Sequence, residues 1–407
     1  MDKFSNHIKN ILHGFFLAIG TTIAEPSTIL PLIVNYFGGG SMLVGFFAAL
    51  LRGGAVIVQL FAAFHAQSYQ LMMPYLRKVF FIRFLSWFLI GVAIFVFGES
   101  YPKVTLFFIG FGLFIFSFSA GFAAIYFREI MGKVFSHKFR GKTMAYRQFF
   151  SGAGGLLSGA LAAWILESFE APQSYAYLFI ISSFIMGLGY FSFALVDEPI
   201  KESVSKRESS FKKFLHNSWL LLRDDKNLQF QIATFFLAYG YLMALPFIIL
   251  DAKEKIDLDG VAIGSLITMQ MVGAMLSNIL WGRLSGGGRD ILSAKFAIFL
   301  QIIALFIAMN ASSLLQYSIV FFLIGASMDG TRIASSNLIL KIAPVQKRPV
   351  YIALQMNIVS LGMFFSIFGG VILNYLNYAT LYISTISVLF AALFFAFKLR
   401  DSELNSE

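Results

Sequence analysis

The sequence predicts an all-α membrane protein with twelve transmembrane helices in two parallel six-helix halves. Of the 407 residues, 58% are hydrophobic and only 13% are charged, whereas soluble domains have about half apolar and about a quarter charged residues. Twelve stretches are apolar over the roughly 20 residues that a helix needs to cross a bilayer. One long polar segment, 197–226, divides these stretches six and six.

The predicted spans occupy most of the chain. They are 15–37, 41–64, 79–98, 104–127, 144–168, 174–196, 227–250, 260–281, 291–310, 315–338, 349–372 and 375–398. We therefore expect an amino-terminal half over 1–196, a linker over 197–226 and a carboxyl-terminal half over 227–407. The first span is too long for a cleavable signal peptide, because it continues to Phe37.

The linker contains a candidate amphipathic helix. Between Phe211 and Arg223, apolar residues recur at helical spacing beside basic ones. This pattern is typical of a helix that lies in the membrane interface, so we expect a tether on the inner surface.

The net charge of +10 is mainly a signal of orientation. By this assignment, 26 of the 31 lysines and arginines lie in the amino terminus, the even-numbered loops, the carboxyl terminus or the span ends next to them. The odd-numbered loops hold only Lys103, Lys253 and Lys255, and the remaining two, Arg52 and Arg332, lie well inside spans. Under the positive-inside rule, both termini and the linker are cytoplasmic, in a plasma membrane or a bacterial inner membrane. Nothing indicates nucleic-acid binding.

Residue types for metal, cofactor or enzyme chemistry give no positive signal. The chain has no cysteine, and its five histidines are scattered without ligand spacing. It has no phosphate-binding loop of the Walker type, no Gly-x-Ser-Gly nucleophile and no His-Glu-x-x-His pair. We therefore expect neither a cofactor nor an enzyme, although a proton gradient remains a possible energy source.

Internal similarity supports two related halves. A shift of 208 residues aligns a loop and the helix after it in the first half with their counterparts in the second, namely Arg140, Ala145 and Gly154 with Arg348, Ala353 and Gly362. Such ordered matches are typical of parallel repeats related by an axis along the membrane normal.

The turn after the eighth span carries a recognisable glycine and arginine pattern. It contains Gly282, Arg283, Gly288 and Arg289, with Gly286 where an aspartate is usual. With the twelve-helix topology, this turn resembles that of the major facilitator superfamily of secondary transporters. The resemblance implies that the first, fourth, seventh and tenth helices line a central cavity and that the halves rock around it. It also implies that Arg140, Arg348 and the turn residues take part in gating.

Four charges inside the spans are the candidate site residues: Glu25, Arg52, Asp329 and Arg332. A central Asp, Lys or Arg costs roughly 2.5 to 3.5 kcal/mol on insertion scales, so the charges that remain usually pair or line a wet path. Glu25 and Arg52 lie at similar predicted depth, while Asp329 and Arg332 share one helix face. Each pair is either a fixed salt bridge or part of a substrate or proton pathway.

The function that these features predict is secondary transport of a small organic solute, with Glu25 or Asp329 as a candidate proton carrier. A carboxylate binds protons more tightly when it is desolvated and less tightly beside a guanidinium, so alternating access can change its protonation. The alternative is a non-transporting receptor or assembly partner with the same fold. We expect the bilayer and the solute as partners, and a functional monomer.

Overall fold

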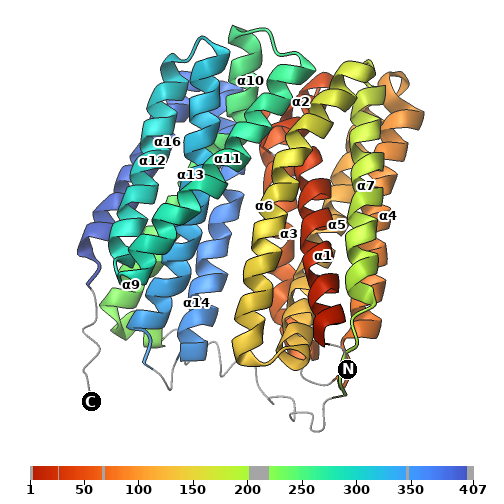
Figure 1. Ribbon diagram of the computed structural model, residues 1–407. Coiled ribbons are helices and arrows are strands. Elements are labelled where there is room, and N and C mark those ends of the chain that lie inside the picture. Colours follow the sequence, from red (N-terminus) through yellow and green to blue (C-terminus); the bar gives the residue numbers. More distant parts are fainter. Residues whose placement is uncertain (1–2, 26, 67–68, 201–219, 345–347, 401–407) are drawn as a thin grey trace. The chain divides into compact units, whose positions relative to one another are not determined.

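The computed structural model describes residues 3–25, 27–66, 69–200, 220–344 and 348–400, and these are almost entirely helical (Figure 1). Contacts divide the chain into two compact units. Unit 1 comprises Met1–Arg207 with Asp257–Thr268, and unit 2 comprises Glu208–Ile256 with Met269–Glu407. Most of the predicted amphipathic segment of the linker, 201–219, lies outside the described residues.

Unit 1 is built from long helices joined by short turns. Its helices are α1 (Lys3–Ile23), α2 (Ile29–Tyr36), α3 (Ser41–Ala66), α4 (Met73–Phe97), the 3-10 segment η1 (Gly98–Ser100), α5 (Pro102–Val134), α6 (His137–Ser168) and α7 (Gln173–Ala194). Helix α1 packs against α6 and α7, while α5 packs against α3 and α4.

Unit 2 has the same style of construction, but two of its long helical stretches are interrupted. Its helices are α9 (Lys226–Ala238), η2 (Tyr239–Met243), α10 (Leu245–Lys255), α11 (Gly260–Gly286), α12 (Asp290–Asn310), α13 (Leu314–Ile342), α14 (Arg348–Ser360), η4 (Leu361–Phe364), α15 (Phe365–Tyr375) and α16 (Tyr378–Lys398). The first part of α11 is grouped with unit 1. Helix α12 packs against α13 and α16, and the 3-10 segments η2 and η4 contact each other.

Ten helical stretches of the described chain are long and apolar enough to cross a membrane. They correspond to the third and later predicted spans. The second predicted span is represented by a shorter apolar stretch, Ser41–Val56. A multi-pass, all-helical membrane protein is therefore confirmed, while twelve spans in two halves stay a prediction.

The first predicted span is not one continuous helix. Helix α1 ends at Ile23 and α2 begins at Ile29, so Glu25 lies in the break and not in mid-helix as expected. Proline, which follows Glu25 in the sequence, has no amide hydrogen and its ring clashes with the preceding turn, and both effects disfavour a continuous helix. At the break, the backbone amide of Ser27 donates to the Glu25 carboxylate.

Helices α11 and α13 cross at very short distance, which positions the candidate site of unit 2. A Cβ atom built on Gly325 would lie 1.9 Å from the Gln270 carbonyl oxygen, so only glycine fits. Next to this crossing, the indole Nε1 of Trp281 donates to the Ala326 carbonyl at 2.9 Å. The contact is of the small-residue kind that membrane helices use for close packing.

We expect Gly325→Ala to destabilise unit 2, because the added methyl group collides with backbone that cannot rotate away. Overpacking typically costs about 1–3 kcal/mol, and a backbone collision belongs at the upper end. Thermal unfolding in detergent measures the effect as a lowered Tm. Gly286→Ala is the matched control, because its added Cβ meets nothing within 4 Å. Equal Tm values for the two variants would contradict the close crossing.

Candidate functional site

Glu25 and Arg52, both in unit 1, approach each other at the break between α1 and α2. The Arg52 Nη2 lies 4.0 Å from the Glu25 Oε1, and the two side chains are 19% and 13% exposed. The same Oε1 accepts hydrogen bonds from the Ser27 hydroxyl at 2.8 Å and the Ser27 amide at 3.3 Å. The carboxylate is thus held mainly by the Ser27 hydroxyl, with the guanidinium at the limit of an ion pair.

Asp329 and Arg332 form a closer pair on α13. The Arg332 Nη2 lies 2.7 Å from the Asp329 Oδ1, and the two side chains are 60% and 17% exposed. The second oxygen, Oδ2, accepts from the Asn278 side-chain amide on α11 at 3.0 Å. The carboxylate is therefore fixed from two helices, while more than half of the Arg332 side-chain surface remains exposed.

Asn278 is a polar residue within the predicted eighth span, 260–281, but its partner could not be read from the sequence. The contact depends on the close crossing of α11 and α13, because it brings position 278 opposite position 329. Each candidate pair lies within its own unit: Glu25 with Arg52 in unit 1, and Asp329 with Arg332 in unit 2.

The turn between α11 and α12 is fixed by a carboxylate that the sequence analysis did not select. Asp290, which is 1% exposed, forms an ion pair with Lys341 at the end of α13. Its Oδ1 accepts from the Ser285 hydroxyl at 2.8 Å and from the Asn337 amide at 3.2 Å. Lys341 also donates to the carbonyl of Gly288 at 2.7 Å. Asp290 therefore locks the turn, although Gly286 stands at the position where the aspartate was expected.

The predicted turn residues themselves play simpler parts. Gly288 has φ +75°, a left-handed conformation that glycine adopts without strain. Gly282 lies within α11, where an added Cβ would meet nothing. Arg283 and Arg289 are exposed and make no ion pair with the residues that the structure describes.

A comparable lock exists at one end of unit 1. The Lys133 Nζ lies 2.6 Å from the Glu198 Oε1, and the Glu198 side chain is only 2% exposed. Glu198 also accepts from the amides of Met72 and Met73, the first donors of α4, at 2.7–3.0 Å. Lys133 donates to the Gln70 carbonyl in the turn before α4 at 3.0 Å. A carboxylate at a helix amino terminus is favoured by the helix dipole as well as by these hydrogen bonds.

The two locking lysines are related by the internal repeat. Lys133 and Lys341 are each the next-to-last residue of their helices, and they lie 208 residues apart, as Arg140 and Arg348 do. The repeat could therefore have identified both lysines. It could not identify their partners, because one carboxylate comes from the turn itself and the other from the segment after α7. Arg140 lies near the start of α6, and Arg348 begins α14.

Arg83 is a correction to the predicted distribution of charge. Arg83 was counted with the loop that precedes its predicted span, whereas it lies inside α4 and is 8% exposed. Its guanidinium donates to the Tyr190 hydroxyl at 2.9 Å and to the Phe116 carbonyl at 2.8 Å. These acceptors and the Phe116 ring, whose centroid lies 3.9 Å from the guanidinium carbon, compensate for the hydration that the guanidinium loses on burial.

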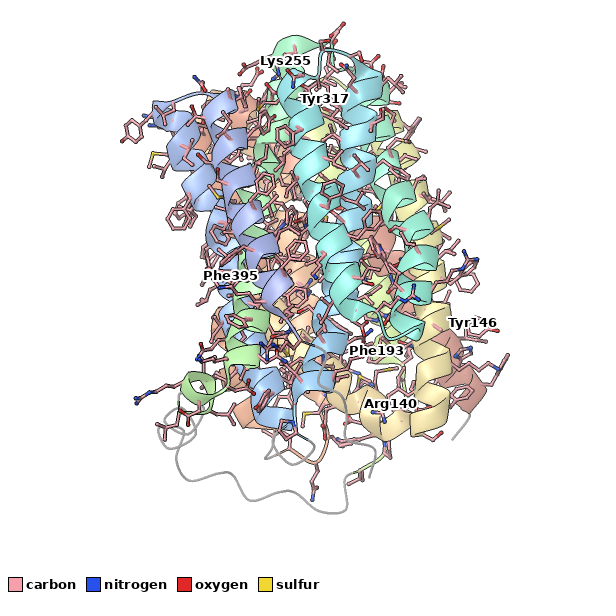
Figure 2. The ribbon with its side chains drawn as sticks, turned by 90° about the vertical axis from the view of Figure 1, so that its left-hand side faces the viewer. Arg140, Tyr146, Phe193, Lys255, Tyr317 and Phe395 are labelled. Carbon is pink, nitrogen blue, oxygen red and sulfur yellow. The ribbon has the colours of Figure 1, made fainter. Side chains whose placement is uncertain are left out.

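Asp251 is a further buried carboxylate that was missed, because the seventh span was predicted to end at residue 250. It is 1% exposed and belongs to α10. Its Oδ2 accepts from Tyr317 and Tyr382 at 2.9 Å each, and from Lys255 at 3.0 Å. Figure 2 labels Lys255 and Tyr317 at the same end of the molecule. Asp251 thus ties α10 to α13 and α16.

Comparison with known proteins agrees with this architecture. Residues 230–407 match the family model described as Major Facilitator Superfamily. No curated protein sequence matches the chain significantly. The nucleoside transporter NupG is 11% identical with a TM-score of 0.76, and the match covers 97% of this chain and 99% of that one.

Two further solved structures have the same fold. The xylose transporter XylE from E. coli, in an inward open conformation, is 14% identical with a TM-score of 0.73, and the match covers 99% of this chain and 98% of that one. A bacterial homologue of the iron transporter ferroportin, in an inward-facing state, is 12% identical with a TM-score of 0.72 over 98% and 99%.

The family match in residues 230–407 and the shared fold are consistent with a secondary transporter of the major facilitator type. This confirms the resemblance predicted from the glycine and arginine turn, and it points away from an enzyme. At identities this low, the solved structures establish the fold alone and no subfamily.

We expect Lys341→Met to destabilise the protein by about 3 kcal/mol, because it leaves Asp290 buried without its cation. A lowered Tm in detergent is the readout. The double variant Asp290→Asn with Lys341→Met removes both charges and should recover most of the loss. If the single and double variants unfold at the same temperature, the ion pair does not hold the turn.

Proposed function

We propose that the protein is a secondary active transporter that moves a small organic solute by alternating access, with twelve spans in two six-helix halves. The observation that carries the proposal is the arrangement at Asp329. One carboxylate oxygen is bound by Asn278 and the other by an Arg332 side chain that is 60% exposed. This arrangement lies inside a candidate membrane span, Leu314–Ile342, and inside the region that matches the family.

Proton coupling through Glu25 or Asp329 is the specific mechanism that we propose. Both carboxylates retain partial exposure, at 13% and 17%, whereas Asp290 is only 1% exposed. A carboxylate that carries protons must meet water in at least one state, and one that only holds helices together need not. The partial exposure of both groups therefore supports a role in a wet path.

The helix breaks support the conformational part of the proposal. Glu25 lies between α1 and α2, and the seventh stretch is interrupted at η2 before α10. Irregular backbone at membrane depth is tolerated where it is buried in protein or lines a water-filled cavity, and such breaks accompany solute and ion sites in transporters. In this mechanism, the Lys133–Glu198 and Lys341–Asp290 locks keep each half rigid while the halves rock.

The solute class is proposed as polar and small. Solved structures with this fold include a nucleoside transporter and a D-xylose-proton symporter, the latter 15% identical with a TM-score of 0.69 over 98% of both chains. Side-chain amides and charged groups such as Asn278 and Arg332 suit hydroxyl-rich or anionic solutes. Uridine and xylose are therefore the first probes that we would use.

Orientation follows from the charge distribution. We propose that both termini face the cytoplasm, that the membrane is a plasma membrane or a bacterial inner membrane, and that the monomer is the functional unit. The support is the positive-inside bias of the loops.

The alternative function is that of a receptor or assembly partner, which would bind solute without turnover.

Asp329→Asn and Glu25→Gln are expected to abolish proton-driven flux while leaving folded protein in the membrane, because an amide cannot take up the proton. Purified protein in liposomes, with labelled uridine or xylose and an imposed pH gradient, measures this as a loss of at least tenfold in driven uptake. Asp257→Asn is the matched control, since Asp257 is exposed. Wild-type coupling in both variants would exclude these proton carriers. Binding of a probe without flux in the wild type would favour the receptor.

A double variant separates a structural from a coupling role for Glu25. Arg52→Met alone should lower the Tm, because it removes the cation from a carboxylate that is only 13% exposed. Glu25→Gln with Arg52→Met should regain stability without regaining proton-driven flux. Recovery of both properties would show that the pair only holds the helices.

A further inference from the structure

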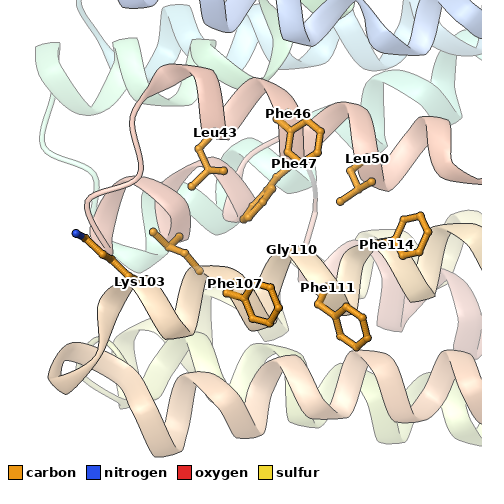
Figure 3. A pocket seen from close by; sticks show the side chains of 10 residues that line it. Leu43, Phe46, Phe47, Leu50, Lys103, Phe107, Gly110, Phe111 and Phe114 are labelled. Atoms are coloured by element: carbon orange, nitrogen blue, oxygen red, sulfur yellow. The ribbon is translucent and has the colours of Figure 1, made fainter.

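An apolar groove runs along the surface of unit 1 between α3 and α5 (Figure 3). It encloses about 550 Å³. Phe46, Phe107 and Phe111 are 47%, 66% and 55% exposed, so their rings face outward from the unit. In a membrane protein, such a surface meets acyl chains.

Lys103 is the one charged residue that lines this groove, and Figure 3 shows its ammonium at one end of the groove. It lies at the start of α5, next to Tyr101, which is 62% exposed. A tyrosine beside a lysine at a helix end is typical of the membrane interface. Within the described chain, Lys103 makes no ion pair or hydrogen bond, and the nearby Glu99 carboxylate accepts from the Tyr36 hydroxyl.

The length of the groove matches one leaflet of a bilayer. Its lining on α5 extends from Lys103 to Phe114. At 1.5 Å per residue this is about 16 Å, and half of a hydrocarbon core is about 15 Å. Helix α3 contributes from Leu43 to Leu50, beginning at the same end. The groove therefore extends from an interfacial cation to about the middle of the membrane.

A second groove on the other side of α5 provides an internal comparison. It lies between α4 and α5 and encloses about 470 Å³. Its lining is apolar apart from the Ser86 hydroxyl, and it contains no charged residue. Phe111 contributes to both grooves. Of these two grooves on α5, only the one with Lys103 has a cation in its lining.

We propose that the α3–α5 groove binds one phospholipid with an anionic headgroup, whose phosphate pairs with Lys103 and whose acyl chain lies along Phe107 and Phe111. The exposed ammonium attracts the headgroup, and the apolar lining takes up the chain. The proposal is independent of the transported solute, because it concerns the outer face of unit 1 alone.

The test uses a tryptophan reporter in the full-length protein. Phe107→Trp, at a ring that is 66% exposed, places an indole in the groove. In vesicles, quenching by phosphatidylglycerol with brominated chains is compared with quenching by brominated phosphatidylcholine, after subtraction of the wild-type signal. We expect about fivefold preference for phosphatidylglycerol, which corresponds to about 1 kcal/mol for one basic residue.

Three controls make the result specific. Lys103→Gln in the reporter background should abolish the preference. Lys78→Gln should leave it unchanged, because Lys78 is an exposed lysine near the start of α4 and does not line the groove. Val96→Trp, in the uncharged groove and 63% exposed, should report no preference. A preference that survives Lys103→Gln would overturn the proposal. Equal quenching by the two lipids would also overturn it. So would the absence of quenching by either lipid, because this would mean that protein covers the groove.

Discussion

A carboxylate that leaves water must gain a cation or several hydrogen-bond donors, and this constraint accounts for much of the arrangement of the described chain. Glu198, Asp251 and Asp290 are all nearly fully buried, and each has a lysine within ion-pair distance. Each also accepts from other donors, namely helix amides, tyrosine hydroxyls or side-chain amides. Because these groups come from different helices, each carboxylate joins elements that are far apart in sequence.

Glu25 and Asp329 differ from these three carboxylates in their exposure. Both keep some exposure, and Glu25 is 4.0 Å from its guanidinium. Their further donors are Ser27 at a helix break and Asn278 across a helix crossing. A carboxylate that is almost fully buried is suited to hold structure, whereas one that keeps some exposure can exchange a proton with water. We therefore propose that the buried carboxylates keep each unit rigid and that Glu25 and Asp329 respond to protons or solute.

The membrane character and the order of the spans were predictable, because the lipid core of a bilayer favours stretches of about 20 mostly apolar residues. The candidate charges at Glu25, Arg52, Asp329 and Arg332 were predictable for the same reason. Arg83 was not, because its position near a helix end resembles that of a loop arginine until Tyr190 and Phe116 are seen around it. Asp251 and Asp290 were overlooked because they lie next to predicted span ends, where a charged residue costs little free energy.

By itself, the sequence determined that the chain crosses a membrane many times, which residues carry unfavourable charge, and that the turn after the eighth span resembles one in the major facilitator superfamily. Only the tertiary structure decided which donor meets which carboxylate, and that a continuous apolar stretch is broken at Glu25. The physical reason is that hydropathy depends on local composition, whereas pairing depends on distances between helices. Those distances are fixed by contacts such as Gly325 on the Gln270 carbonyl, which no single segment contains.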